Sequence, residues 1–429
     1  MNISVIGSGY VGLTTALGLA TKGHRVSCID IDENKVDMIN RGEPPFYQDR
    51  LAEVLTEQVK RTNNLRASLD YDDILSSEVT FICVNTCRNS GKNSDLSPVR
   101  QTATEIGRKL ACKEDYHLVV TKSSVPPGTT DEVIIPLVEQ SSARQAGRHF
   151  GIAVNPEFLQ EDRVLDSFLN SDRIVVGQYD RRSGDILQDV YNAFTAPKLR
   201  TRIRTAEMIK FASNAFLATR VSFINEIGNL CKKLGIDVYE VADGMGYDPR
   251  IGKRYLNAGV GFGGSCLPKD LEALLHKYES MDERSPLLAA VYEVNKCQPH
   301  RLVEVARARL GGLRGKRVSV LGLAFKPHTD DIRHAPALEV IALLLQEGSF
   351  VTAYDPRAMP GVRHYYPNII YASNVHEALE GTDCVMIVTE WPEFKNERLY
   401  EGKVVIDGRR TLDPDKAKVI CNCYEGLCW

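Results

Sequence analysis

The first thirty residues constrain the fold more than any other part of the chain. Residues 1–6 form an apolar run, residues 7–12 read GSGYVG, and a helical pattern continues to Ala20. A second apolar run at 25–29 ends in Asp30. Glycines with this spacing between a strand and a helix, followed by a strand that ends in an acid, predict the opening of a dinucleotide-binding α/β sheet.

Each position of this motif has a physical reason. Gly7 permits a tight turn, Gly9 lets the backbone approach a pyrophosphate, and Gly12 lets the helix pack closely on the sheet. Asp30 would accept hydrogen bonds from ribose hydroxyls and repel a 2′-phosphate, so the sequence favours NAD over NADP. The alternative is a glycine-rich turn that binds no ligand.

Composition narrows the class of protein. A chain of 429 residues is too long for one core and predicts two or three domains. Its net charge of −3 argues against nucleic acid or an anionic membrane as the main partner, and no segment has the length of an apolar membrane span. Eleven cysteines without a signal-peptide pattern indicate reduced thiols in the cytoplasm. Cys421, Cys423 and Cys428 have no histidine nearby, so we expect no metal site.

Short apolar runs alternate with helical patterns from residue 1 to about 200. The runs at 79–84 and 117–121 are typical of buried parallel strands. Thr86 and Ser124 lie in the polar loops that follow these runs. Because ligands of such sheets bind outside the carboxyl ends of the strands, we expect both loops to face the dinucleotide.

A long helical pattern extends from Thr205 to about Leu234. Lys210 and Asn214 are four residues apart in it, so their side chains project from one face. A lysine on a buried face is costly unless it is paired or used in chemistry. The alternative is that its aliphatic stem packs while the amine reaches water.

Cys266 lies in the segment 261–270, which reads GFGGSCLPKD. Its glycines allow a close approach of the backbone to a ligand, and Pro268 predicts the first turn of a helix. A cysteine at a helix N-terminus is favoured as the nucleophilic thiolate. The alternative is a small buried hydrophobic residue, the usual state of a free cysteine.

A second α/β unit begins at about Gly315. Its first strand ends at Gly322 alone, without the remaining glycines of the motif, so we expect no dinucleotide there. Lys326, Arg333, Arg409 and Arg410 supply cations near predicted strand ends and suit a phosphate-bearing ligand, the alternative being solvated surface charge.

The predicted fold is therefore two Rossmann-like doubly wound parallel-sheet domains joined by a central helical domain with a long connecting helix. We place the dinucleotide domain at residues 1–200, the helical domain at 201–305 and the second Rossmann-like domain at 306–429.

Together these elements indicate an oxidation at carbon. An alcohol needs no thiol to become an aldehyde, but a thiolate is useful for converting an aldehyde to an acid through a thioester. Lys210 and Asn214 suit the carbonyl oxygen in that reaction, and three carboxylates could manage protons and water. These carboxylates are Asp270, Glu157 and Glu161.

The chain resembles the UDP-glucose 6-dehydrogenases, a branch of the UDP-glucose/GDP-mannose dehydrogenase family, up to about residue 410. The motifs that carry the resemblance are residues 7–12, 155–161, 207–214, 261–270, 322–326 with Asp331 and Arg333, and 407–410. The resemblance implies an NAD-binding first domain, a helical centre that forms a homodimer, and a last domain that holds the UDP moiety. The implied reaction oxidises C6 of UDP-glucose to UDP-glucuronate with two NAD and one water.

The resemblance also implies roles for individual residues. Cys266 would be the nucleophile, Lys210 would steady the oxyanion, Asn214 and Asp270 would position water, and Glu157 would assist thioester hydrolysis. Glu161 would join the same water network, and Ser124 stands where the family usually has threonine. The cofactor set is Gly7, Gly9, Tyr10, Val11, Gly12, Asp30, Lys35, Thr86, Ser124, Glu161, Lys269 and Arg333. The substrate set is Glu157, Phe158, Leu159, Lys210, Asn214, Tyr255, Gly263, Phe325, Lys326, Arg409 and, from the partner subunit in the dimer, Arg250.

Three alternatives stay open at this point. The same chemistry could act on GDP-mannose or a UDP-N-acetylhexosamine, because the cysteine and lysine motifs are shared between the branches. A one-step dehydrogenase of the 3-hydroxyacid or 6-phosphogluconate kind also has a lysine and an asparagine four apart, but it would not need Cys266. A non-catalytic sugar-nucleotide sensor would gain nothing from a thiolate.

Overall fold

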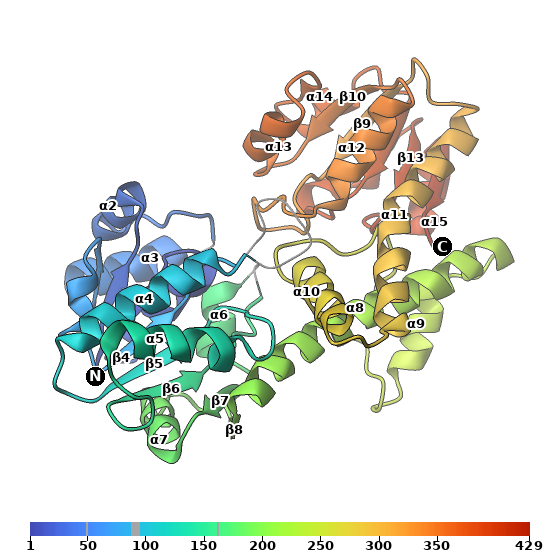
Figure 1. Cartoon of the computed structure of the whole chain (residues 1–429). Coiled ribbons are helices and arrows are strands. Elements are labelled where there is room, and N and C mark those ends of the chain that lie inside the picture. Colours follow the sequence, from blue (N-terminus) through green and yellow to red (C-terminus); the bar gives the residue numbers. More distant parts are fainter. Residues whose placement is uncertain (49, 87–94, 161–162) are drawn as a thin grey trace. The chain divides into compact units, whose positions relative to one another are not determined.

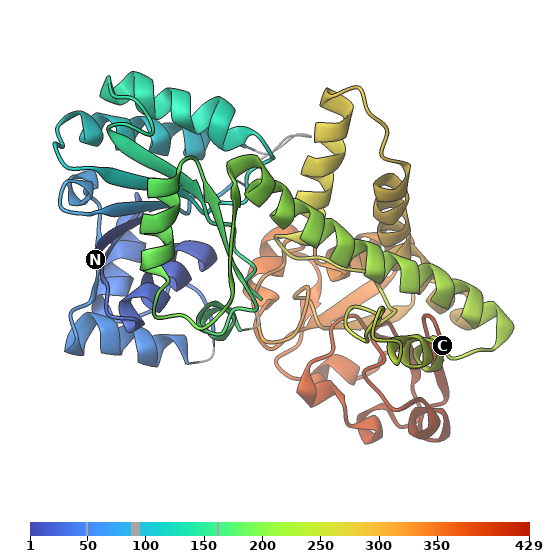
Figure 2. The same ribbon diagram turned by 90° about the horizontal axis from the view of Figure 1, so that it is seen from below.

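The computed structural model describes residues 1–48, 50–86, 95–160 and 163–429. Its described part divides into two compact units, Met1–Ser213 and Asn214–Trp429. Each unit contains one sheet covered by helices (Figure 1). The division falls inside α8 (Ile203–Leu234), one uninterrupted helix that is seen along its length in Figure 2.

The first unit is built on an eight-stranded sheet of order β3-β2-β1-β4-β5-β6-β7-β8. Its strands are β1 (Asn2–Ile6), β2 (Arg25–Ile29), β3 (Leu65–Ser68), β4 (Val79–Ile82), β5 (His117–Thr121), β6 (Phe150–Val154), β7 (Ile174–Gln178) and β8 (Lys198–Arg202). Neighbouring strands are parallel except β6 and β7, so β7 and β8 run against the other six. The doubly wound sheet is as predicted, whereas the reversal at β7 is not visible in the sequence pattern.

Both faces of this sheet are buried, because successive strand residues enter different cores. Leu118 and Val120 of β5 pack in the core that contains α1, whereas Val119 packs in the core that contains α4 and α5. The helices of this unit are α1 (Tyr10–Thr21), α2 (Glu33–Arg41), α3 (Leu51–Thr56), α4 (Ser97–Ala111), α5 (Ile135–Ser142), α6 (Val164–Leu169) and α7 (Arg181–Val190). Burial on both faces explains the near-continuous apolar runs of the strands.

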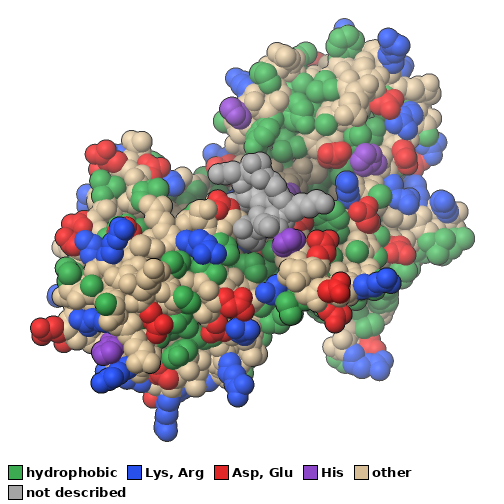
Figure 3. Space-filling model, in the orientation of Figure 1, with side chains coloured by type: hydrophobic (Ala, Val, Ile, Leu, Met, Phe, Trp, Pro, Cys, Tyr) green, Lys and Arg blue, Asp and Glu red, His purple; other side chains and the backbone are tan. Residues whose placement is uncertain are grey.

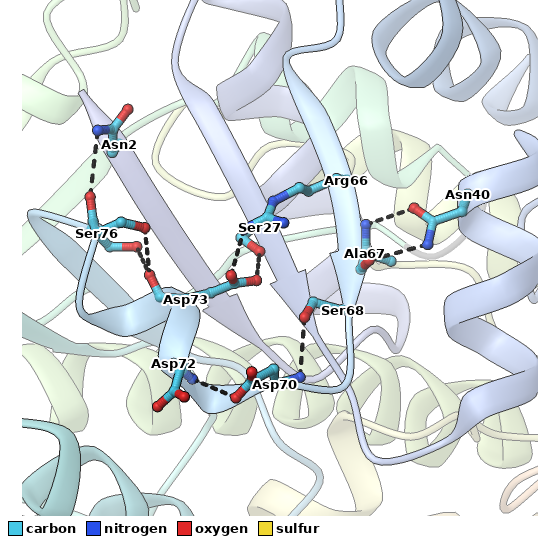
Figure 4. A network of polar contacts seen from close by, with 11 residues as sticks. Asn2, Ser27, Asn40, Arg66, Ala67, Ser68, Asp70, Asp72, Asp73 and Ser76 are labelled. Atoms are coloured by element: carbon cyan, nitrogen blue, oxygen red, sulfur yellow. Dashed lines mark hydrogen bonds and ion pairs between the residues drawn. The ribbon is translucent and has the colours of Figure 1, made fainter.

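A polar network holds the outer strands β2 and β3 of this sheet (Figure 4). The Ser27 hydroxyl of β2 donates to Asp73, which also pairs with Arg66 of β3. The Asn40 amide, in the last turn of α2, binds both backbone groups of Ala67 at 2.9 and 3.0 Å. These contacts fix β2 and β3, and with them the acid that follows β2.

The second unit begins within α8 and continues through three helices before its sheet. They are α9 (Val238–Gly246), α10 (Leu267–Ser280) and α11 (Pro286–Leu310). The sheet has six parallel strands in the order β11-β10-β9-β12-β13-β14. Its strands are β9 (Arg317–Leu321), β10 (Phe350–Tyr354), β11 (Ile370–Tyr371), β12 (Cys384–Ile387), β13 (Val404–Asp407) and β14 (Cys423–Gly426), and its helices are α12 (Pro336–Gln346), α13 (Met359–Tyr365), α14 (Val375–Leu379) and α15 (Pro414–Ile420).

Strand residues of this sheet also alternate between two cores. Val318 and Val320 of β9 pack with residues of α11 and α12, whereas Leu321 packs with residues of α14 and α15. The second unit is thus a doubly wound sheet with helices on both faces, as predicted.

The surface drawn in Figure 3 shows acidic and basic side chains interspersed, in keeping with a net charge of −3. No helix within the described ranges combines the length and apolar character needed to cross a membrane.

Candidate functional site

The glycine turn after β1 is fixed by close backbone contacts. Gly7 has φ +98°, and a Cβ there would lie 2.7 Å from the Cys83 carbonyl oxygen. A Cβ on Gly12 would lie 1.8 Å from the Gly7 carbonyl oxygen. Gly9, in contrast, has no atom within 4 Å of its Cβ position. Gly7 and Gly12 are therefore required by packing, and Gly9 leaves the N-terminus of α1 open to a ligand.

Asp30 follows β2 beside this turn and is half-buried. It accepts the Ser8 N–H at 2.6 Å, the Ser8 hydroxyl at 2.5 Å and the Asp32 N–H at 3.0 Å. Burial raises the pKa of Asp30, but the hydrogen bonds from Ser8 and Asp32 outweigh that effect and leave the pKa below its ordinary value. The result is an ionised acceptor at the edge of the turn.

These residues fit a bound NAD. Gly9 caps α1 without a side chain that would occupy the backbone N–H groups, and an open helix N-terminus suits a pyrophosphate. The partly exposed Asp30 carboxylate is a suitable acceptor for ribose hydroxyls.

Five further residues predicted for the cofactor lie in the first unit, in α1, in α2 and in the loops after β4 and β5. Lys269 and Arg333, also predicted for the cofactor, belong to the second unit. The Tyr10 ring stacks on Phe46 with centroids 4.1 Å apart, and Val11 follows it in α1. Lys35 lies in the first turn of α2, 3.8 Å from the Asp32 carboxylate. The Thr86 hydroxyl donates to the Ser124 carbonyl oxygen at 3.0 Å, so the loops after β4 and β5 are in contact.

A buried ion pair joins Glu157 to Lys210. The Lys210 Nζ lies 2.8 Å from Glu157 Oε1, and both side chains are only 4% exposed. The other Glu157 oxygen accepts the Leu159 N–H at 2.7 Å. Burial raises the pKa of Glu157, but the nearby Lys210 ammonium outweighs that effect, so this pKa lies below its ordinary value. The predicted lysine is therefore buried and paired, and the alternative of a solvated amine is wrong.

Phe158 lies beside this pair. Its ring has the Arg173 guanidinium 3.7 Å and the Lys210 amine 5.6 Å from its centroid. Lys210, Phe158, Leu159 and Glu157 thus form one group in the first unit.

Sequence reasoning missed a second buried lysine, Lys122. Its amine donates to Asn155 Oδ1 at 2.8 Å, an oxygen that also accepts the Tyr191 hydroxyl at 2.6 Å. Burial lowers the pKa of Lys122 to about 8. Lys122 and Glu157 line the same small cavity. The signal that could have found it is its place directly after β5, where a lysine would be expected to face the ligand edge of the sheet.

In the second unit, Cys266 is the N-cap of α10. Its Sγ lies 3.4 Å from the Ser265 hydroxyl, and its thiol is half-buried. One turn later, Asp270 is buried and accepts the Asn214 amide at 2.6 Å, with the Lys269 amine 3.0 Å from its other oxygen. The structure therefore brings Asn214 and Asp270 together, and it confirms the helix start predicted from Pro268.

The glycines before Cys266 are required by packing. Their Cβ positions are occupied by the chain itself, and the approach of their backbone to a ligand stays a prediction. A Cβ on Gly261 would lie 2.6 Å from Asn295 Oδ1, one on Gly263 would lie 2.2 Å from the His334 carbonyl oxygen, and one on Gly264 would lie 2.7 Å from the Phe325 ring. The close approach that requires glycine here is to the protein's own backbone and side chains.

The predicted nucleotide-binding cations lie in loops at the ends of strands of the second sheet. Lys326 has its amine 5.4 Å from the centroid of its neighbour Phe325. The Arg409 guanidinium donates to the Val388 carbonyl oxygen at 3.0 Å and lies 3.7 Å from Glu390. Arg333 pairs with the buried Asp331 through bonds of 2.5 to 3.0 Å.

Arg250 and Tyr255 lie in the loop after α9. The Arg250 guanidinium is 87% exposed and pairs with Asp248. Tyr255 has φ +63° and is exposed. Neither side chain lies in the core of the second unit.

Comparisons with known proteins agree with this arrangement. Family models for the UDP-glucose/GDP-mannose dehydrogenase family match residues 1–195 (NAD binding domain), 204–297 (central domain) and 319–414 (UDP binding domain). The chain belongs to the UDP-glucose/GDP-mannose dehydrogenase family. It is an NAD-dependent oxidoreductase of that family.

Relatives of this chain include a UDP-glucose 6-dehydrogenase of Haloferax volcanii. It is 42% identical over 422 residues, which cover 96% of this chain and 97% of the relative. A solved UDP-glucose dehydrogenase of Pyrobaculum islandicum is 41% identical with a TM-score of 0.95, over 100% of this chain and 98% of the other. A solved UDP-D-ManNAc dehydrogenase of Pyrococcus horikoshii is 28% identical with a TM-score of 0.87, over 100% and 99%.

Membership in the family assigns NAD to the first sheet and a UDP-sugar to the second. Glu161, predicted for the water network and the cofactor, lies outside the described residues. The individual roles of the remaining predicted residues stay predictions.

Proposed function

We propose that this enzyme oxidises C6 of UDP-glucose twice, to UDP-glucuronate, through a covalent adduct on Cys266. The observation that carries the proposal is Cys266 at the N-terminus of α10, one turn before a buried Asp270 held by Asn214. A single oxidation of an alcohol needs no thiol, so this group of residues favours oxidation to the acid.

The C6 alcohol first loses a hydride and its hydroxyl proton and becomes the aldehyde. The Cys266 thiolate then forms a bond to the aldehyde carbon and gives a thiohemiacetal oxyanion, which becomes a thioester on loss of a second hydride. Water then attacks the thioester, releasing the carboxylate and regenerating the thiol. NAD, when bound, supplies the hydride acceptor for both oxidations, and the overall reaction uses two NAD and one water.

The charged residues have complementary roles in this proposal. Lys210 steadies the oxyanion on C6, and Glu157 holds the Lys210 amine and assists thioester hydrolysis. Asn214 and Asp270 position the attacking water, together with Ser124 and Glu161. Cofactor contacts are assigned to the turn 7–12 and to Asp30, Lys35, Thr86, Ser124, Glu161, Lys269 and Arg333. Substrate contacts are assigned to Phe158, Leu159, Arg250, Tyr255, Gly263, Phe325, Lys326 and Arg409.

UDP-glucose is favoured as the substrate. The relatives that are 42% and 41% identical are named for UDP-glucose, whereas the UDP-D-ManNAc enzyme is 28% identical. GDP-mannose and UDP-N-acetylhexosamines are the alternatives for the same chemistry. A sensor without catalysis is the alternative from another class, and the set of Lys210, Cys266 and Asp270 argues against it because a sensor gains nothing from a thiolate.

The proposal includes a homodimer. Phe216, Phe223 and Leu230 recur at seven-residue intervals on α8 and are 61, 46 and 55% exposed. An exposed apolar row with this spacing is suited to a second copy of the helix. We place the exposed Arg250 across that interface, in contact with the partner's substrate. The domain division at residues 1–200, 201–305 and 306–429 and a cytoplasmic location complete the proposal.

The decisive experiment measures NADH formed per mole of limiting UDP-glucose, beside GDP-mannose and a UDP-N-acetyl sugar. Two equivalents from UDP-glucose are expected, together with loss of acid formation in Cys266→Ser, because a serine hydroxyl is a far weaker nucleophile at neutral pH. One equivalent, or wild-type turnover in Cys266→Ser, would remove the thiol from the mechanism. Two equivalents from another sugar nucleotide alone would keep the mechanism and change the substrate.

A further inference from the structure

The loop that leads to Cys266 is held by an amide on α11. We call residues 258–265 the nucleophile loop. Asn295 accepts the Phe262 N–H at 2.7 Å and donates to the Phe262 carbonyl oxygen at 3.0 Å. One side chain thus satisfies both backbone groups of a single residue, which is the pairing that a neighbouring antiparallel strand would provide. The nucleophile loop is not itself a strand, so Asn295 takes the place of one.

The loop is shaped to accept this amide. Gly261, next to Phe262, has φ +96°, a conformation that side-chain-bearing residues rarely adopt. A Cβ at Gly261 would also lie 2.6 Å from Asn295 Oδ1. A larger residue at position 261 would clash with Asn295, so the hydrogen bonds between Asn295 and Phe262 depend on both the glycine and the asparagine.

Backbone contacts fix the loop on either side of Phe262. The Val260 N–H donates to the Gly408 carbonyl oxygen at 2.9 Å, and the Gly264 N–H donates to the Arg333 carbonyl oxygen at 2.9 Å. Gly408 follows β13, and Arg333 lies in the loop between β9 and α12. The nucleophile loop is thus attached to two loops of the second sheet, and Asn295 holds the residue between these attachment points.

We propose that Asn295 is a positioning residue for Cys266. This inference rests on the proposed function, in which Cys266 is the nucleophile. Asn295 fixes Phe262, four residues before Cys266, and so fixes where the sulfur lies at the start of α10. A displacement of about 1 Å in a reacting group can cost roughly 100-fold in rate, so loosening this loop is expected to act on kcat.

The test compares Asn295→Ala and Asn295→Asp with the wild-type enzyme. Alanine removes both hydrogen bonds, whereas aspartate keeps an acceptor for the Phe262 N–H but sets a carboxylate oxygen against the Phe262 carbonyl oxygen. We expect kcat to fall about 10- to 100-fold in both variants, with the KM for UDP-glucose changed by less than about threefold.

The second readout is alkylation of Cys266 by iodoacetamide, in which sulfur displaces iodide, followed on the Cys266 peptide by mass spectrometry across pH 6–9. The alanine variant is expected to change the rate and the pH profile of this reaction, which a role in stability alone would leave unchanged in the folded protein. Lys296→Ala is the matched control, since Lys296 is the exposed neighbour on α11. It is expected to behave as the wild type in both assays.

The proposal is overturned if Asn295→Ala keeps kcat and the alkylation profile within about twofold of wild type. It is also overturned if both Asn295 variants lose kcat only in step with their melting temperatures while Cys266 reacts normally. Failure of the proposed function is distinguishable from either result, because Cys266→Ser would then retain turnover whatever the behaviour of Asn295→Ala.

Discussion

Both sheets of the molecule begin with a strand, a glycine of positive φ and a second strand that is followed by an aspartate. The Gly7 N–H donates to Ile29 at 2.7 Å, and the Gly322 N–H donates to Tyr354 at 2.9 Å, so the two turns close in the same way. They differ in what comes next. After Gly7 the helix α1 begins at Tyr10, whereas after Gly322 the next helix begins only at Pro336.

The two aspartates differ more sharply than the two glycines. Asp30 is half-buried and accepts three hydrogen bonds, two from Ser8 of the glycine turn and one from the Asp32 N–H. Asp355 is fully buried, and its oxygens are occupied by hydrogen bonds from the protein itself. It accepts four backbone N–H groups at 2.7 to 3.1 Å and the Trp391 indole N–H at 3.0 Å. The difference teaches that an acid after the second strand marks a ribose site only when its oxygens stay accessible.

The largest effect expected from this comparison is structural. Asp355→Ala leaves five donors without their acceptor, four of them on buried residues, and should lower the free energy of unfolding by about 4 kcal/mol, with the affinity for NAD unchanged. Urea unfolding and calorimetric NAD titration measure the two quantities. A stability loss under about 1 kcal/mol would break the comparison, because Asp355 would then not be needed by the loops it binds.

The next largest effect is a pH dependence of the free energy of unfolding that arises from Lys122 in the first unit. Burial lowers the pKa of Lys122 to about 8 from an ordinary value of 10.5. The unfolded chain therefore binds this proton more tightly, so the folded state carries a penalty below pH 8 that is relieved as pH rises towards 10.5. Lys122 should add about 2 kcal/mol to the free energy of unfolding between pH 7.5 and 9.5. The measurement is urea unfolding at several pH values, with Lys122→Met as the variant that lacks this slope.

In the second unit, the buried Asp407 should give the opposite dependence of stability on pH. Burial raises the pKa of Asp407 to about 6 from 3.8, so the folded state holds this proton more tightly and loses stability as pH rises from about 4 through 6. The expected loss is about 1 kcal/mol between pH 5 and 7.5, and Asp407→Asn should remove it. Equal slopes in wild type and both variants would show that neither buried group titrates as described.

The last expected effect is on the cofactor. Asp30→Ala should weaken NAD binding about tenfold and reduce the preference for NAD over NADP, because it removes a charged acceptor for ribose hydroxyls. Its free energy of unfolding should fall less than in Asp355→Ala, because three donors rather than five lose their acceptor. Calorimetric titration with both cofactors decides this, and an unchanged NAD affinity would end the distinction between Asp30 and Asp355.

The same contrast explains what could be predicted from the sequence. The turn 7–12, Asp30 and the α10 start at Cys266 follow from local spacing, because each depends on neighbours within a few residues. Residues brought together by the sheet were harder to predict. Lys122, Asn155 and Tyr191 meet only because β5, β6 and α7 pack together, and no local pattern relates them. The packing contacts of Gly261 and Gly263 could not be predicted for the same reason, since they come from α11 and from the loop before α12.

The contact between Gly12 and Gly7 has a consequence for how such a chain can evolve. With a Cβ at Gly12 only 1.8 Å from the Gly7 carbonyl oxygen, any larger residue at position 12 must displace the turn itself. Selection therefore acts on the two glycines as one inherited unit, and lineages that retain the cofactor have few viable mutational steps there.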